Sequence, residues 1–264
     1  MYPVKYHKAT SIAEATAALS AGEDATILAG GQTLLATMKQ HLAAPSDLVD
    51  IRGIADLNGV SVEGDTLTIG AATNHRDVAM NADVQKLCPA LAELASNIGD
   101  PAVRNAGTIG GSLANNDPAA DYPAAILALN ATIVTNRREI AADDYFEGLF
   151  GTALDDGEII TAVKIKSPSK AAYVKFAQQA SLFALVGVFV ADGAGGVRVT
   201  VTGAGEDGVF RQSAMESALA ASWSAGALEG VDASEEGIIS DLHGSADYRA
   251  HLINVMAKRA VTAA

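Results

Sequence analysis

The stretches Ala29-Gly30-Gly31-Gln32-Thr33 and Thr108-Ile109-Gly110-Gly111-Ser112 decide the fold of this chain. The first follows the apolar run Ala25–Leu28, and each pattern predicts a strand that ends in a tight turn. Because glycine has no Cβ, a bound molecule can approach the backbone of such a turn closely. Two glycine turns that face each other can hold a pyrophosphate group through backbone amides, without lysine or arginine.

Composition sets the outer bounds of the function. The chain has 264 residues and 49% hydrophobic residues, which is enough for a sizeable core in one large domain or two domains. The net charge of −13 argues against binding to nucleic acid or to anionic membrane surfaces. No apolar run is long enough to span a membrane, and the first residues lack the apolar core of a signal peptide. The single cysteine, Cys88, excludes an internal disulfide and indicates a reducing cytoplasm.

The reactive side chains are too few or too scattered for several kinds of chemistry. One thiol cannot hold an iron–sulfur cluster. The histidines form no helical metal-binding pair, so we expect no metal site. No Gly-x-Ser-x-Gly turn and no phosphate-binding loop with a lysine is present. We therefore expect an organic cofactor to supply any chemistry, and we assign no catalytic residue.

Apolar periodicity predicts alternating helices and strands in the first two thirds of the chain. Ser11 and Glu14 have the spacing of a capping box at the start of a helix. The predicted helices are Ile12–Ser20, Leu34–Leu42, Asp77–Asn81, Pro89–Ile98 and Asp121–Asn130. The predicted strands are Tyr2–His7, Ala25–Leu28, Asp47–Ile51, Gly59–Val62, Thr66–Ile69, Ala131–Thr135 and Glu158–Ile165.

The segment Ser167-Pro168-Ser169 breaks this pattern and is the predicted domain boundary. Three β segments follow, and then two helices, which together indicate a small α+β domain. The β segments are Ala172–Gln179, Ala184–Ala191 and Val197–Thr202, and the helices are Gln212–Ala221 and Tyr248–Ala260. The predicted domains are 1–168, with subdomains of about 1–55 and 56–168, and 169–264.

With their flanking residues, the glycine stretches resemble the FAD-binding medium subunit of the molybdenum hydroxylases. This family includes aerobic carbon monoxide dehydrogenase and the xanthine dehydrogenase-like enzymes, and the resemblance covers the whole chain. Ala29–Leu35 resembles the first flavin loop of the family, and Ile98–Leu113 resembles the second. Asp117–Asp121 and Phe150–Leu154 with Glu158–Ile160 are similar to later family segments.

The resemblance implies an α+β fold. It consists of a two-subdomain FAD-binding domain of the vanillyl-alcohol-oxidase (PCMH) type and a C-terminal domain with a three-stranded antiparallel sheet and helices. It implies FAD on this chain, with molybdopterin and iron–sulfur clusters on partner subunits only. Neither glycine stretch holds a histidine, cysteine or tyrosine, so we expect the FAD to be non-covalent. The family assembly is a dimer of heterotrimers, which contain an iron–sulfur small subunit and a molybdopterin large subunit.

The resemblance also marks the residues expected to bind the cofactor. These are Ala29, Gly30, Gly31, Gln32, Thr33, Leu34, Ile98, Thr108, Ile109, Gly110, Gly111, Ser112, Asn115, Asp121, Ile160 and Lys175. The backbone amides of both stretches are assigned to the pyrophosphate, and Asp121 is assigned to hydroxyls of the flavin's sugar or ribityl chain.

Several of these residues have plainer alternatives. Thr33, Ser112 and Asp121 can instead cap the helices that follow them. Ile98 and Ile160 fit contacts to the flavin ring and fit ordinary core positions equally well. Either Lys175 or Gln178 can approach the flavin from the C-terminal domain.

A second set of residues in the family pattern is given structural roles. Asp117 fits a turn better than a ligand. Asn116 is a weaker candidate ligand than Asp121, and Arg104 fits a residue that braces the second glycine stretch.

The function expected from this resemblance is electron transfer. Electrons would pass from iron–sulfur clusters on a partner subunit to this chain's FAD, and from there to an external acceptor. One alternative is a free-standing flavin oxidase of the vanillyl-alcohol-oxidase type, although the residues after 168 are few for its substrate domain. The other alternative is a flavin-binding or scaffold protein without enzymatic activity.

Overall fold

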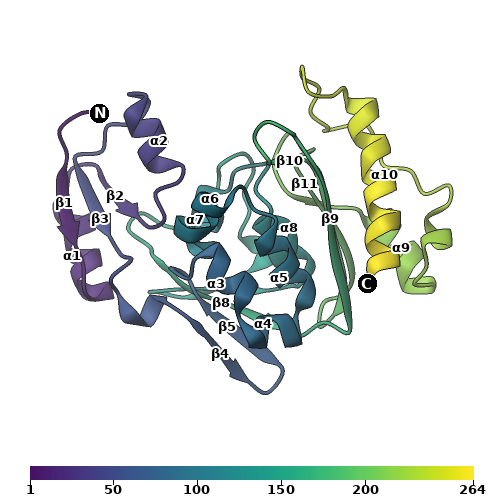
Figure 1. The fold of residues 1–264 in the computed structure, drawn as a ribbon, viewed down its shortest axis with the longest axis horizontal. Helices are drawn as coiled ribbons and strands as arrows, with labels where there is room; N and C mark the ends of the chain where they lie inside the picture. Colours follow the sequence, from purple (N-terminus) through teal and green to yellow (C-terminus); the bar gives the residue numbers. More distant parts are fainter.

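The computed structural model describes all 264 residues and contains three β-sheets that follow one another along the chain (Figure 1). The first sheet is parallel, with strand order β1-β3-β2. Its elements are β1 (Lys5–Lys8), α1 (Ile12–Ala21), β2 (Ala25–Leu28), α2 (Leu34–Lys39) and β3 (Asp47–Asp50). Ser11 caps α1 by accepting from the Glu14 N–H, as the capping-box spacing predicts.

The second sheet is antiparallel, with strand order β4-β5-β8-β6-β7. Its strands are β4 (Val60–Glu63), β5 (Thr66–Gly70), β6 (Thr132–Thr135), β7 (Glu139–Ala141) and β8 (Ile160–Lys166). Six helices lie between β5 and β6 in the chain and supply much of the largest apolar core. They are α3 (His75–Met80), α4 (Ala82–Leu87), α5 (Pro89–Ser96), α6 (Pro101–Ala106), α7 (Ile109–Asn115) and α8 (Tyr122–Ala128).

The third sheet is antiparallel and belongs to the last third of the chain, with strand order β12-β11-β10-β9. Its elements are β9 (Lys170–Ala177), β10 (Ala184–Gly193), β11 (Gly196–Thr202), β12 (Phe210–Arg211), α9 (Ser213–Ala221) and α10 (Ala246–Ala263). The three expected strands are present, and the two-residue β12 is added at the edge. Helices α9 and α10 pack on one face of this sheet and α5 and α8 on the other (Figure 1).

The prediction of a strand before the second glycine stretch is wrong. This stretch follows α6 and forms the first turn of α7, whose N-cap is Thr108. Asp100 caps α6 by accepting from the Val103 N–H, and Pro101 occupies the first helical position, where proline lacks only a hydrogen bond that is absent anyway. The apolar residues of this segment therefore belong to short helices with one apolar face and do not form a buried strand.

Other differences concern the ends of elements and the short helices. The predicted helix Leu34–Leu42 ends at Lys39, and His41 has a positive φ of 62°. The strand predicted over Glu158–Ile165 begins at Ile160, because Glu158 is held in a loop by hydrogen bonds. Helix α4 was not predicted, although Asn81 caps it. No helix is both long and apolar enough to cross a membrane.

Candidate cofactor-binding cleft

The two glycine stretches lie next to each other and line one cleft of about 750 Å³. Segments from β2–α2, α3, α6–α7, the loop before α8 and the loop before β8 line the cleft. The predicted residues that line it are Ala29, Gly30, Gly31, Gln32, Thr33, Leu34, Ile98, Thr108, Gly110, Gly111, Ser112, Asn115, Asp121 and Ile160. Ile109 and Lys175 are the predicted residues that do not.

The first glycine stretch presents a run of free backbone amides. From Ala29 to Leu34, no backbone N–H donates to a group of the protein. Gly31 has φ +70°, a conformation that glycine adopts without strain. These residues are half-buried or exposed and line the cleft, so a run of free N–H donors there fits an anionic ligand such as a pyrophosphate.

Gly30 and Gly110 are glycines because protein backbone packs against them. A Cβ at Gly30 would lie 2.3 Å from the Ala106 carbonyl oxygen, and one at Gly110 would lie 2.7 Å from the Ala71 carbonyl oxygen. Gly30 therefore sets the approach of the first glycine stretch to the end of α6. The reason expected from the sequence, close approach of a ligand to both glycines, is replaced by close approach of one loop to another.

Four of the five amides of the second stretch, those of Ile109 to Ser112, are already bonded, and the Thr108 N–H is free. The N–H groups of Ile109 and Gly110 donate to the carbonyls of Thr73 and Ala71, and the Gly111 N–H donates to the Thr108 hydroxyl. Ile109 is fully buried in the core. The second stretch therefore offers one free backbone amide, that of Thr108, whereas the first offers a run of them.

Side chains replace amides as the polar groups of the second stretch. The Ser112 hydroxyl and the Asn115 amide line the cleft and have no hydrogen-bond partner in the protein. Thr108 caps α7, so Ser112 is not needed as a cap. In the first stretch, Thr33 precedes α2 but makes no capping hydrogen bond. The capping alternatives for Thr33 and Ser112 are thus not realised, and both hydroxyls are free to bind a ligand.

Asp121 is a buried charged residue of the cleft wall, and two side chains of the third sheet contact it. Its carboxylate accepts a hydrogen bond of 2.5 Å from the Tyr173 hydroxyl and lies 3.0 Å from the Lys175 Nζ. It makes no capping bond to α8. Burial raises the pKa of Asp121, and the adjacent Lys175 and Tyr173 act in the opposite direction. Lys175 thus reaches the cleft only through Asp121.

Three neighbouring residues support the backbone near the cleft: Arg104 and Asp117 as expected from the sequence, and Asn116, which was considered as a weaker candidate ligand. Arg104 Nη1 donates to the carbonyls of Ile98 and Gly99, at 3.0 and 2.7 Å, and so braces the segment before α6. Asp117 forms a turn by accepting from the Ala119 N–H. Asn116 ends α7 with φ +41° and donates to two carbonyls of the loop after β7, those of Gly148 and Gly151.

Apolar residues also line the cleft. Ile98 is half-buried and Ile160 is 4% exposed, and both line the cleft while they also contact the large core. Each of the two roles considered for these residues is therefore compatible with its position. Leu154 and Phe183 add further apolar surface to the cleft.

Sequence reasoning missed several lining residues, of which His75 is the most unusual. It is 5% exposed, and its buried Nδ1 has no hydrogen-bond partner. Burial, with a smaller contribution from Arg104, lowers the pKa of His75 to about 4, so the ring is neutral near pH 7. An Asn-His-Arg sequence at a helix start gives no signal of this position.

The loop 155–158 was also missed as a whole, although the family-like segment Glu158–Ile160 pointed to its end. Glu158 lines the cleft and accepts from Arg138 Nη2 at 3.0 Å and from the Thr135 hydroxyl at 2.6 Å. Hydrogen bonds from Arg138 lower the pKa of Glu158 to about 2. This loop is therefore a fixed, ionised part of the cleft wall.

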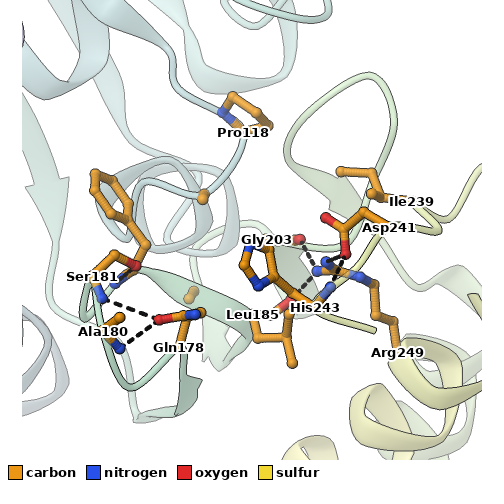
Figure 2. A pocket seen from close by; sticks show the side chains of 13 residues that line it. Pro118, Gln178, Ala180, Ser181, Leu185, Gly203, Ile239, Asp241, His243 and Arg249 are labelled. Carbon is orange, nitrogen blue, oxygen red and sulfur yellow. Dashed lines mark hydrogen bonds and ion pairs between the residues drawn. The ribbon is translucent and has the colours of Figure 1, made fainter. Parts of the chain in front are cut away.

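A second cavity of about 430 Å³ lies beside the β9–β10 turn (Figure 2). Gln178 faces this cavity and accepts from the N–H groups of Ala180 and Ser181, so it stabilises the turn and does not point into the cleft. Arg249 donates to the carbonyls of Leu185 and Gly203 and to Asp241. Phe183 lines both cavities.

A cleft lined by a run of free amides and hydroxyls suits a cofactor that carries phosphate, and the comparisons identify the family of this chain. Residues 2–168 match the family described as "FAD binding domain in molybdopterin dehydrogenase". The chain therefore belongs to the FAD-binding medium subunits of the molybdenum hydroxylases, and its cofactor is FAD. The α+β fold expected from the sequence, with a two-subdomain FAD-binding part, is confirmed.

Three relatives illustrate the similarity. The carbon monoxide dehydrogenase medium chain of Hydrogenophaga pseudoflava is 34% identical over 98% of this chain and 96% of that one. The nicotine 6-hydroxylase medium subunit of Paenarthrobacter nicotinovorans is 36% identical, with 99% and 97% covered. The structure of quinoline 2-oxidoreductase from Pseudomonas putida 86 superposes with a TM-score of 0.89 at 29% identity, with 100% and 97% covered.

The names of these relatives bear on the alternatives left open by the sequence. The two curated relatives are described as a medium chain and a medium subunit, which are parts of larger enzymes. The chain is accordingly a flavoprotein subunit of a molybdopterin-dependent oxidoreductase, and the reading as a free-standing oxidase is not supported.

Proposed function

We propose that this protein receives electrons from iron–sulfur clusters on a small partner subunit, holds them on its own FAD and passes them to an external acceptor. Substrate would be hydroxylated at a molybdopterin site on a large partner subunit. The observation that carries the cofactor part of this proposal is the run of free amides from Ala29 to Leu34, in a cleft that Ser112 also lines. When bound, FAD supplies the ability to take up electrons singly and release them in pairs.

We assign the cofactor contacts to the lining residues by chemistry. The amides of the first stretch, with the hydroxyls of Thr33 and Ser112, suit the pyrophosphate, because both groups donate hydrogen bonds to phosphate oxygens. Asp121 suits a sugar or ribityl hydroxyl, because a carboxylate accepts hydrogen bonds. Ile98 and Ile160 suit the flavin ring, and Lys175 acts through Asp121. The second-stretch amides from Ile109 to Ser112 are left out, since they bond within the protein.

We further propose the division into 1–168, with subdomains of about 1–55 and 56–168, and 169–264. The family match that ends at residue 168 and the three separate sheets support it. We propose a dimer of heterotrimers on the strength of the resemblance to the family. A cytoplasmic location is supported by the single free, buried cysteine, Cys88.

Co-purification tests the proposed assembly. Tagged protein isolated from its own host should carry a second chain with iron–sulfur absorption and a third with molybdopterin. Recovery of a flavin-loaded chain without partners, together with turnover of an organic substrate, would contradict it. A chain that binds no FAD at micromolar concentration would contradict the cofactor assignment itself.

A further inference from the structure

A buried charge cluster joins the cleft wall to the third sheet. Asp121 lies between β9 residues Tyr173 and Lys175 on one side and the cleft on the other. The side chains of Asp121 and Lys175 are 4% and 8% exposed. Tyr173 is fitted into this position by Gly187 of β10, because a Cβ at Gly187 would lie 2.3 Å from the Tyr173 hydroxyl.

The hydrogen bonds of Lys175 define its charge. Its Nζ contacts the Asn97 carbonyl at 2.7 Å, the Leu182 carbonyl at 3.1 Å and the Asp121 carboxylate at 3.0 Å. Three acceptors around one nitrogen use all three hydrogens of an ammonium group, whereas a neutral amine has only two. The Lys175 side chain is therefore a cation, and the carboxylate beside it is its counter-ion.

The third sheet also fixes the backbone that carries Asp121. The Thr202 hydroxyl donates to the carbonyls of Pro118 and Ala120, at 3.0 and 2.6 Å. The Thr200 hydroxyl donates to the Ala124 carbonyl at 2.7 Å. Segment 118–124 is thus hydrogen-bonded to β11 on both sides of Asp121, while β9 holds its carboxylate.

We infer that Tyr173 and Lys175 are positioning residues that hold Asp121 as a charge-balanced hydrogen-bond acceptor for a hydroxyl group of FAD. This inference rests on the proposed function. Oδ1 of Asp121 faces both partners, whereas Oδ2 has only the 3.3 Å contact to Lys175 and keeps acceptor capacity. The third sheet therefore takes part in cofactor binding although none of its strand residues lines the cleft.

Charge balance explains why the lysine is needed. FAD carries a negatively charged pyrophosphate, and an unpaired carboxylate on the wall would repel it in a site of low dielectric. Paired with Lys175, Asp121 adds no net charge to the wall and still accepts a hydrogen bond. Removing one member of a buried ion pair costs more than removing both, because a single buried charge is left behind.

Titration of the full-length apoprotein with FAD, followed by quenching of flavin fluorescence, tests the inference. The variants are Lys175→Met, Asp121→Asn, the double variant and Tyr173→Phe. The matched control is Lys170→Met on the same strand, since Lys170 lies 5.2 Å from the centre of the Trp223 ring and away from the cleft. Circular dichroism of each apoprotein verifies that it folds.

We expect Lys175→Met to raise the Kd for FAD at least about tenfold and Lys170→Met to leave it unchanged. Adding Asp121→Asn to Lys175→Met should bring the Kd back toward that of Asp121→Asn alone. A purely structural role of Lys175 at the Asn97 and Leu182 carbonyls gives no such rescue, so a double variant as weak as Lys175→Met would overturn the inference.

Tyr173→Phe keeps the test decisive if Lys175→Met does not fold. It removes one hydroxyl from the fully satisfied cluster and should raise the Kd about threefold or more. An unchanged Kd would overturn the inference. The wild-type protein separates the two possible failures. If the wild type binds FAD, these results overturn the inference and leave the proposed function intact. If the wild type does not bind FAD, the proposed function itself is contradicted.

Discussion

At the residue scale, Gly30 is the position where we expect the addition of one methyl group to destabilise the protein most. Gly30→Ala would place a Cβ 2.3 Å from the Ala106 carbonyl oxygen, so the first glycine stretch and the end of α6 must separate. We expect a loss of about 2 kcal/mol in the free energy of unfolding and a weaker affinity for FAD. Denaturant unfolding and FAD titration measure the two effects.

Gly53→Ala is the matched control for this prediction. A Cβ at Gly53 would have its nearest neighbours at 3.6 Å, which is ordinary contact distance. We expect its stability to stay within about 0.5 kcal/mol of the wild type, with unchanged FAD affinity. Equal effects of the two substitutions would mean that the contact between the loops does not organise the cleft.

His75 should make stability depend on pH in a predictable direction. Its pKa falls from 6.5 to about 4 on folding, because burial disfavours the charged ring. The unfolded chain therefore takes up a proton below pH 6.5 that the folded chain does not accept until about pH 4. Stability should fall across this window, by as much as about 3 kcal/mol from this residue.

His75→Gln isolates this effect from that of the carboxylates. We expect the difference in unfolding free energy between wild type and variant to change between pH 7 and pH 4, with the wild type losing more as the pH falls. Chemical denaturation at several pH values measures it. Parallel pH profiles would show that His75 does not titrate differently in the folded and unfolded states.

At the element scale, the start of α7 depends on the Thr108 cap. The Thr108 hydroxyl accepts from the Gly111 N–H at 3.1 Å, and the helix then presents Ser112 to the cleft. Thr108→Val removes this acceptor and should cost about 1 kcal/mol of stability and lower the affinity for FAD. Thermal unfolding and FAD titration report the two changes.

Asn81→Ala at the start of α4 controls for loss of a helix cap. Asn81 accepts from two N–H groups, and it does not line the cleft. A similar loss of stability without a change in FAD affinity is expected. If Thr108→Val likewise leaves the affinity unchanged, the first turn of α7 does not contribute to the cofactor site.

Elements with a strong local signal could be predicted from the sequence, and elements defined by distant contacts could not. The strand Ala25–Leu28 and the capped helix after Ser11 were predicted because apolar alternation and a capping residue are local. Helix α7 was missed, because two glycines disfavour a helix until the Thr108 cap and the packing of Gly110 on Ala71 are in place. Helix α6 was missed although Asp100 followed by Pro101 is a local helix-start signal.

The same distinction applies to the cleft. The glycine stretches and Asp121 carry motifs that the sequence displays. The free amides of one stretch and the bonded amides of the other depend on Ala71 and Thr73, which no local pattern connects to Ile109 and Gly110. His75 reaches the cleft only through folding, and so does the contact of Lys175 with Asp121.

At the scale of the whole molecule, the mode of FAD attachment is testable in one step. His75 is the histidine among the residues that line the cleft, and no cysteine or tyrosine lines it. The buried Nδ1 and the low pKa of His75 fit a packing role. We expect acid precipitation of the holoprotein to leave the yellow colour in the supernatant. Colour retained in the pellet would indicate a covalent bond, with His75 as the first residue to examine.

The last prediction concerns activity without partners. A chain with FAD and one buried cysteine can store electrons but has no cluster of its own to receive them from a distant centre. We therefore expect the isolated holoprotein to hydroxylate no organic substrate, while a chemical reductant still bleaches its flavin. Activity should appear only when iron–sulfur and molybdopterin subunits are added. A steady-state assay of the purified chain, before and after this addition, is the measurement, and turnover by the chain alone would restore the free-standing oxidase as the better account.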